Sequence, residues 1–273
     1  MGKFLIFCLN LILSCLYCRG QNPVDCGSKA VRDSLMMVYS DKAGKYGFND
    51  DHWGETLDSL IAICPNIPEA YQEKALPYLY NGDYATAFAL IDKAVEIDQK
   101  GWRAYRGYLN CIFTRNYERA MVDLRDAQLL EPRAHTMDHT YYFYYGLCYL
   151  ETGQYELAEQ EFLKDIVEQR RGDGRNDIHF NSLFYLGVTY FELKALDLAE
   201  KYFKDCLQLY EQFPEGNYYM GTVLRILGNP GAESYFAKAR EFYNEGYRMT
   251  EPNLTYVTFP RQLSLIEIDE IQK

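Results

Sequence analysis

The sequence lacks the features that mark several common protein classes. It has 28 lysines and arginines against 39 aspartates and glutamates, a formal net charge of −11. A chain this acidic has no overall positive field to attract nucleic acid or anionic lipid. It also has no GxSxG, GxxxxGK[ST] or HExxH motif, and no GxGxxG after a strand. We therefore expect no nucleic-acid partner, no catalytic site and no cofactor.

The overall composition is that of an ordinary globular protein. Apolar residues make up 48% of the chain and charged residues 25%, which excludes a disordered tail protein, a collagen and a polytopic membrane protein. Aromatic residues are abundant, with 26 tyrosines and 15 phenylalanines. Their positions follow an internal repeat, described below.

Residues 1–20 have the pattern of an export signal. Lys3 precedes an apolar stretch, Phe4–Tyr17, that is too short to span a bilayer comfortably. Cleavage before Gln21 gives a secreted protein, whereas lipidation of Cys15, in a segment similar to a bacterial lipobox, gives a lipoprotein. An uncleaved anchor is the third alternative. We expect an exported bacterial protein that is periplasmic or associated with the outer membrane, and a lipid anchor as its only membrane attachment.

Five cysteines follow the signal region, and no two of them have CxxC spacing. The sequence therefore predicts neither a zinc site nor a complete disulfide framework. A bridge between Cys26 and Cys64 stays open. Cys111, Cys148 and Cys206 lie on apolar helix faces, where a free cysteine behaves as a small hydrophobic residue.

A pattern of small, large and small residues at positions i, i+4 and i+7 occurs five times. The leading alanines are separated by 33, 38, 41 and 33 residues. A turn precedes each copy, and a second amphipathic segment precedes each turn, so each repeat predicts a pair of helices. The five copies begin at Ala87, Ala120, Ala158, Ala199 and Ala232.

The repeats resemble the tetratricopeptide-repeat family. The likeness covers about residues 68–243 and is clearest in Tyr142-Phe-Tyr-Tyr-Gly-Leu-Cys-Tyr149, which Gly153-Gln-Tyr155 and Ala158 follow. It implies an all-α superhelical solenoid of about five to six antiparallel helix pairs. Close helix crossings are expected where Gly146, Gly187 and Gly221 meet Ala158, Ala199 and Ala232.

Degenerate elements are expected at both ends of this array. Residues 21–67 form an N-terminal segment with a degenerate repeat, whose first helix spans Lys29–Tyr39 behind Ser28. Residues 244–273 form a linker and a C-terminal capping helix that begins at Pro260, with Leu263, Ile266 and Ile271 as its apolar residues. Insertions fall near His135–Asp138 and Gly172–His179.

The resemblance implies that the first helix of each pair faces a concave groove. The residues predicted to face this groove are apolar and aromatic in the middle of the array, and arginines among them supply positive charge. Such a surface suits a peptide that bears carboxylates. Alternatively the chain fills its own groove with the C-terminal helix, or a second copy fills it. The dicarboxylate clamp of chaperone-binding members needs Lys and Asn where Gln72 and Leu76 stand, so chaperone tails are disfavoured. The predicted groove residues are Gln72, Leu76, Arg103, Arg106, Asn110, Phe113, Phe143, Leu147, Phe184, Val188, Phe191, Tyr218 and Arg225.

The predicted function is a non-catalytic scaffold of the cell envelope that binds a protein or peptide of unknown identity; self-association is also possible. One alternative is a structural subunit of an envelope or secretion complex. Another is a metal-dependent enzyme in which His135, Asp138 and His139 act together, but Asp138 is better explained as a helix cap. The segment 173–177 departs from a calcium loop and is interpreted as a surface loop, so no metal is predicted.

Overall fold

A computed structural model describes residues 24–172 and 178–270. The predicted signal peptide, the lipidation candidate Cys15 and the segment 173–177 lie outside the described residues. The chain divides into two compact units, Met1–Lys74 and Ala75–Lys273. Among the described helices, none has the length and apolar composition needed to cross a membrane.

The first unit contains α2 (Lys29–Ala43), α3 (Asp51–Ile63) and the start of α4 (Pro68–Tyr80). The expected helix behind Ser28 is present and continues to Ala43, although the Ser28 side chain makes no capping hydrogen bond. Asp50 caps α3 by accepting a hydrogen bond from the backbone N–H of His52. A disulfide joins Cys26 to Cys64 and ties the residues before α2 to the end of α3.

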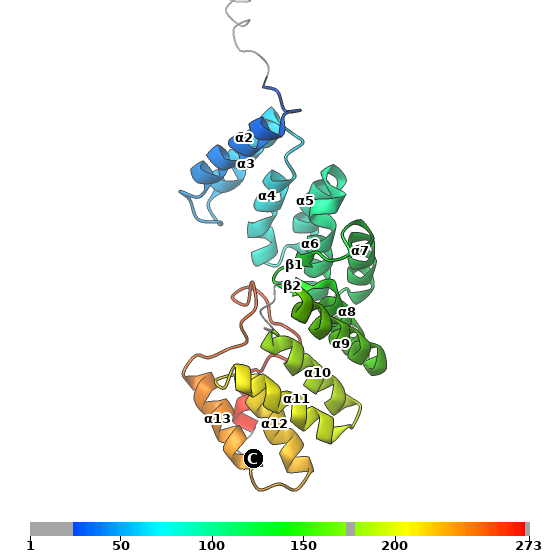
Figure 1. Ribbon diagram of the computed structural model, residues 1–273. Coiled ribbons are helices and arrows are strands. Elements are labelled where there is room, and N and C mark those ends of the chain that lie inside the picture. The colour runs from blue at the N-terminus through cyan, green and yellow to red at the C-terminus, as the bar shows by residue number, and fades with distance from the viewer. Residues whose placement is uncertain (1–23, 173–177, 271–273) are drawn as a thin grey trace, which may run out of the picture. The chain divides into compact units, whose positions relative to one another are not determined.

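The second unit consists of helices that follow one another as packed neighbours (Figure 1). Even-numbered helices also contact one another, α6 with α8, α8 with α10 and α10 with α12, so we name these four the inner helices. This arrangement confirms the predicted all-α solenoid. The elements are α5 (Tyr84–Ile97), α6 (Gln99–Ile112), α7 (Tyr117–Leu130), β1 (His135–Thr136), β2 (His139–Thr140), α8 (Tyr141–Glu151), α9 (Tyr155–Gly172), α10 (Phe180–Glu192), α11 (Leu196–Leu209), α12 (Pro214–Ile226), α13 (Ala232–Asn244) and α14 (Leu265–Glu270).

Glycines allow the two helices of a pair to approach closely, but their partners differ from the expected alanines. A Cβ atom on Gly146 would lie 2.7 Å from the ring of Phe162, and one on Gly187 would lie equally close to Phe203. These phenylalanines sit four residues after the alanines that the pattern predicted, so the large residue of each copy covers the glycine. Gly107 and Gly221 occupy the same position opposite Leu124 and Phe236.

The insertion at His135–Asp138 forms a β-hairpin instead of the start of a helix. Thr136 pairs with His139 across the hairpin, and Met137 and Asp138 form its turn with φ of 47° and 69°. Asp138 is therefore not a helix cap, and the side chain of Thr140 caps α8 instead. The helix pattern failed here because two consecutive left-handed residues favour a tight hairpin turn.

The expected helix from Pro260 is also wrong. Residues 248–264, which we name the C-terminal segment, have no regular secondary structure, and α14 begins only at Leu265. Arg261 has φ of 61°, a left-handed conformation that a right-handed helix cannot contain. Leu263 is buried, but Ile266 is 70% exposed, and Ile271 lies outside the described residues.

Candidate functional site

The C-terminal segment lies against the inner helices and contributes to their core. Met249, Phe259 and Leu263 are 1%, 1% and 5% exposed, and they belong to the same apolar cluster as the inner helices. The hydroxyl of Tyr185 in α10 donates to the carbonyl of Pro260 at 2.9 Å. Three side chains and one backbone carbonyl of the C-terminal segment are therefore bound by the repeat array.

Charged groups fasten the middle of this segment to two inner helices. Arg261 pairs with Glu151 at the end of α8, at 2.8 Å, and with Glu192 at the end of α10, at 2.7 Å.

The backbone N–H of Leu263 donates to Glu215 in α12 at 3.2 Å. Burial raises the pKa of the Glu215 carboxyl to about 7, so part of it is protonated near neutral pH.

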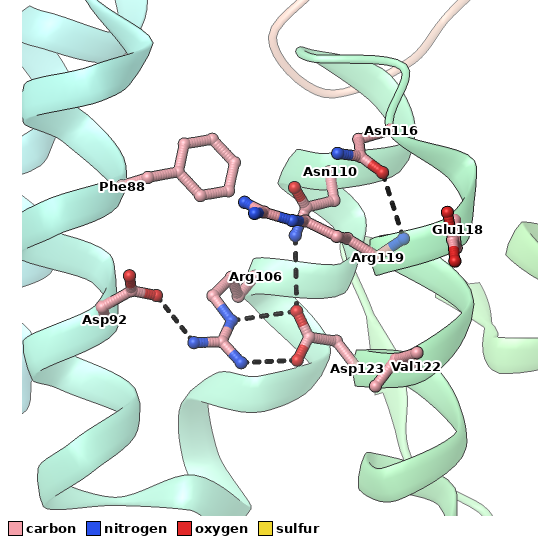
Figure 2. Close-up of a pocket in the computed structure, with 9 residues that line it drawn as sticks. All are labelled: Phe88, Asp92, Arg106, Asn110, Asn116, Glu118, Arg119, Val122 and Asp123. Atoms are coloured by element: carbon pink, nitrogen blue, oxygen red, sulfur yellow. Dashed lines mark hydrogen bonds and ion pairs between the residues drawn. The ribbon is translucent and has the colours of Figure 1, made fainter.

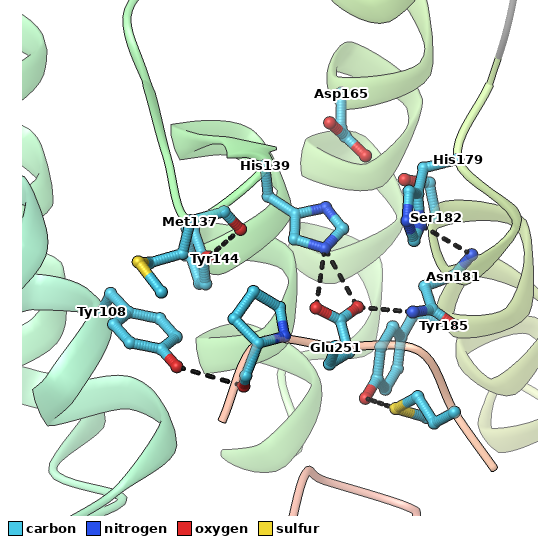
Figure 3. A network of polar contacts seen from close by, with 12 residues as sticks. Tyr108, Met137, His139, Tyr144, Asp165, His179, Asn181, Ser182, Tyr185 and Glu251 are labelled. Atoms are coloured by element: carbon cyan, nitrogen blue, oxygen red, sulfur yellow. Dashed lines mark hydrogen bonds and ion pairs between the residues drawn. The ribbon is translucent and has the colours of Figure 1, made fainter. Parts of the chain in front are cut away.

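A buried polar network holds the beginning of the segment (Figure 3). Glu251 accepts hydrogen bonds from His139 Nε2 at 2.9 and 3.0 Å, and from the side-chain amide of Asn181. The ring of His139 stacks on Phe143 with centroids 3.6 Å apart. His179 lies beside His139, and burial lowers its pKa to about 4, so it is neutral at pH 7. The i, i+4 spacing suggested that His135 and His139 act together. His135 is instead exposed on β1, and the neighbours of His139 are His179 and Glu251.

These contacts favour the alternative in which the chain fills its own groove. The filling element is the irregular segment 248–264 and not a helix. A partner that binds the same inner surface must displace Glu251, Arg261 and Leu263 from their hydrogen bonds.

An open cleft of about 570 Å³ lies between α5 and α7, over α6 (Figure 2). At its base Arg106 makes two hydrogen bonds to Asp123, of 2.6 and 2.9 Å, and one to Asp92 of 2.6 Å. These carboxylates neutralise Arg106 and hold its pKa above the usual value. Arg119 differs, because its guanidinium points across the cleft toward Phe88 and has no hydrogen-bond partner among the described residues.

Most of the predicted groove residues are core residues. Phe143 packs on Phe162 and Tyr185, and Phe184 packs on Phe203 and Phe213, so both side chains are buried in the core. At most 9% of the surface is exposed for Leu76, Asn110, Phe113, Phe143, Leu147, Phe184 and Val188. Partial or larger exposure remains for Gln72, Arg103, Arg106, Phe191, Tyr218 and Arg225. Partner binding by the exposed residues stays a prediction.

The predicted set also mixes two helix faces. Phe143 and Phe184 each lie three residues before the glycine of the helix crossing, whereas Arg106 lies only one residue before Gly107. Arg106 and Tyr108 are two residues apart, a rotation of about 200° on a helix. Tyr108 accordingly faces the C-terminal segment, where its hydroxyl accepts from Asn253 at 2.9 Å, and Arg106 faces the cleft.

Residues 68–100 and 181–213 match the family model of the tetratricopeptide repeat. The chain contains tetratricopeptide repeats and has the fold of a tetratricopeptide-repeat solenoid. No curated protein gives a significant match to the sequence. Proteins built on this fold mediate protein–protein interactions, and that general role agrees with the sequence prediction.

Several solved structures are similar to this chain. PilW, described as a widely conserved type IV pilus biogenesis factor, has 16% identity and a TM-score of 0.66, with 90% of this chain and 100% of PilW covered. PilF of Pseudomonas aeruginosa has 16% identity and a TM-score of 0.63, with 88% and 98% covered. YrrB, described as having an unusual peptide-binding site, has 16% identity and a TM-score of 0.50, with 70% and 94% covered. Identities this low show the fold alone.

Sequence reasoning missed the groups that define both surfaces of this tetratricopeptide-repeat protein. Tyr185, Glu151 and Glu215 anchor the C-terminal segment, yet they occupy ordinary helix positions. Phe88 and Arg119 belong to second helices, which were not considered as binding elements. The three cysteines expected in the core, Cys111, Cys148 and Cys206, are buried.

Proposed function

We propose that this protein is an exported, non-catalytic scaffold that holds a partner protein through the cleft between α5 and α7. The observation that supports this proposal is the guanidinium of Arg119, which lies in an open cleft without a bonded acceptor. Arginine presents a planar set of donors that matches a carboxylate, and such groups recur at the centres of protein interfaces.

The chemistry of the cleft defines the partner segment. Phe88 and Val122 provide an apolar wall, and Val122 is 55% exposed. Arg106 is already paired with Asp92 and Asp123, so Arg119 is the cation left for an incoming group. We therefore expect a peptide segment in which a carboxylate lies next to an apolar side chain. Its carboxylate pairs with Arg119 and its apolar group packs on Phe88.

Export is part of the proposal and has three supports. The apolar stretch Phe4–Tyr17 has the length of a signal peptide. The Cys26–Cys64 disulfide belongs to an oxidising compartment, since thiols stay reduced in the cytosol. PilW, which has a similar fold, is described as a type IV pilus biogenesis factor, and this agrees with a role in the cell envelope. Lipidation of Cys15 remains the alternative to release as a secreted protein.

Site-specific photo-crosslinking tests the cleft directly. A photoreactive amino acid at Val122 is compared with the same residue at Lys204, an exposed position on α11. Envelope extract is added, and the crosslinked protein is identified by mass spectrometry. We expect a specific adduct from Val122 only, and we expect Arg119→Glu to abolish it.

The matched control is Arg133→Glu, which makes the same charge change at a side chain that is 86% exposed. This variant should keep the adduct. Equal crosslinking from Val122 and Lys204, or an adduct that survives Arg119→Glu, would show that the cleft is not the binding surface.

A second candidate function is a structural subunit of an envelope assembly. The observation that favours it is the likeness to PilW over the full length of that protein. A subunit should copurify in a complex of fixed stoichiometry on size-exclusion chromatography, whereas a peptide-binding scaffold should dissociate on dilution. The chromatography of tagged protein from native membranes therefore separates the two candidates.

A further inference from the structure

His139, His179 and Glu251 come together from three separate parts of the chain (Figure 3). His139 lies on β2, His179 directly before α10, and Glu251 on the C-terminal segment. One potential ligand atom from each residue lies within 4.8 Å of the other two. Within residues 24–172 and 178–270, no other group of three His, Cys, Asp or Glu residues meets that criterion.

The site contains two buried carboxylates close to His139. The side chain of Glu251 is 0% exposed, and Asp165 behind His139 is also 0% exposed. Their hydrogen bonds come from His139, Asn181, Thr140 and Gln169, and in the described part of the chain no lysine or arginine bonds to either carboxylate. Burying a carboxylate without a countercharge is costly, and a bound cation removes that cost.

His139 also has a nitrogen that the protein leaves unused. Nε2 bonds to Glu251, but Nδ1 is buried and has no hydrogen-bond partner. An imidazole that serves only to pack in a core satisfies both nitrogens, because an unpaired buried polar atom costs about 1–3 kcal/mol. Binding of an ion at Nε2, the nitrogen that faces Glu251, would leave the imidazole proton on Nδ1, which lies on the side of Asp165 (Figure 3). A metal-ligating histidine commonly has a carboxylate at its second nitrogen.

The donor set selects the type of metal. Calcium and magnesium prefer oxygen ligands, whereas two imidazoles and one carboxylate suit a late first-row divalent ion. Zinc commonly takes three such protein ligands and a water molecule.

We propose that His139, His179 and Glu251 bind one zinc ion, which fastens the C-terminal segment to β2 and to the start of α10. Because Glu251 belongs to the segment that covers the inner helices, the ion controls how firmly that surface is closed. The site is independent of the cleft at Arg119, so either proposal can fail without the other.

Metal titration of the purified, chelator-treated protein tests the site. Zinc chloride is titrated by calorimetry, and cobalt chloride is titrated while the visible spectrum is recorded. We expect one ion per chain and the intense d–d absorption of four-coordinate cobalt. The absence of stoichiometric binding, or a six-coordinate cobalt spectrum, would overturn the proposal without any variant.

Two variants with the same chemical change locate the ion. His179→Asn removes a ligand but keeps a side-chain acceptor for the backbone N–H of Asn181. His135→Asn makes that change at an exposed residue on β1. Since outer partners of a metal site alone change affinity about 10–100-fold, we expect His179→Asn to weaken zinc binding by at least ~100-fold. We expect His135→Asn to leave the affinity unchanged.

Proteolysis reads out the effect on the C-terminal segment. Zinc should slow tryptic cleavage after Arg261 in the parent protein and in His135→Asn, but not in His179→Asn. Circular dichroism of each protein shows that the fold is retained. Zinc that binds equally to both variants, or that leaves the cleavage rate of the parent unchanged, refutes the proposed role.

Discussion

Gly146 in α8 lies so close to α9 that a single methyl group has no space. A Cβ atom there would lie 2.7 Å from Cε1 of Phe162 and 2.8 Å from two further ring atoms. Phe162 cannot retreat, because it is 0% exposed and stacks on Tyr185 with centroids 6.0 Å apart and planes at 7°. Phe143 packs against the same ring at 73°. Gly146→Ala must therefore move a helix or a packed aromatic ring.

The two opposing effects of this substitution can be compared. Replacing glycine by alanine inside a helix normally stabilises it by about 1 kcal/mol. Overpacking a dense core costs about 1–3 kcal/mol. We expect Gly146→Ala to lower the free energy of unfolding by ~1–2 kcal/mol and Gly146→Leu to lower it by more. For a chain of this size that corresponds to a fall in Tm of ~2–8 °C.

Thermal unfolding followed by far-ultraviolet circular dichroism measures this effect. Gly54→Ala is the matched control, because Gly54 lies inside α3 and a Cβ there meets nothing within 4 Å. It should raise the stability by up to about 1 kcal/mol. If Gly146→Ala is as stable as the parent while Gly54→Ala gains stability, the close crossing of α8 and α9 does not exist.

Three further predictions concern other parts of the chain. Intact mass should show a mature terminus at Gln21 or an acyl increment on Cys15, and a protein that keeps its first twenty residues contradicts both schemes. Reduction of the Cys26–Cys64 disulfide, which closes a loop of 38 residues, should lower the stability of the first unit by up to ~4 kcal/mol, as measured by melting with and without reductant; equal melting curves would contradict this. Burial raises the pKa of the Glu215 carboxyl from 4.5 to about 7, so the folded state favours the protonated carboxyl. Its contribution to the free energy of unfolding is fully present below about pH 4.5 and falls by up to ~3 kcal/mol as the pH rises to about 7. Glu215→Gln should flatten that pH dependence in urea titrations, and an unchanged slope would exclude Glu215 as its source.

The helix pairs could be predicted because their packing leaves a local signal. The pattern i, i+4, i+7 places small and large residues on one helix face, and a left-handed residue such as Gly82 or Gly153 separates the helices. Lys194 and Arg115 occupy that turn position with φ of 62° and 52°, so the turn is kept without glycine. Local geometry was therefore sufficient to predict the helix pairs.

The groove could be predicted only in part, since the sequence does not fix the rotation of each helix. Arg106 was grouped with Phe143 by its spacing, although Gly107 aligns with Gly146 and places Arg106 on another face. That glycine was the available signal. The C-terminal segment has no periodicity, and its contacts reach across 75 residues to Tyr185 and 112 residues to His139. Such pairings have no local pattern.

The bonds of the C-terminal segment also change how the array folds. In a simple repeat protein each repeat contacts only its neighbours, so the ends fray independently of the middle. Here contacts separated by 145, 110 and 48 residues join α6, α8 and α12 to one segment through Tyr108, Glu151 and Glu215. Unfolding of any one repeat removes part of the bonding that holds the C-terminal segment, and this weakens the contacts of that segment with the remaining repeats. The second unit should therefore unfold in one cooperative transition. Because these contacts join residues that are far apart in sequence, we expect them to form late, after the helices have assembled.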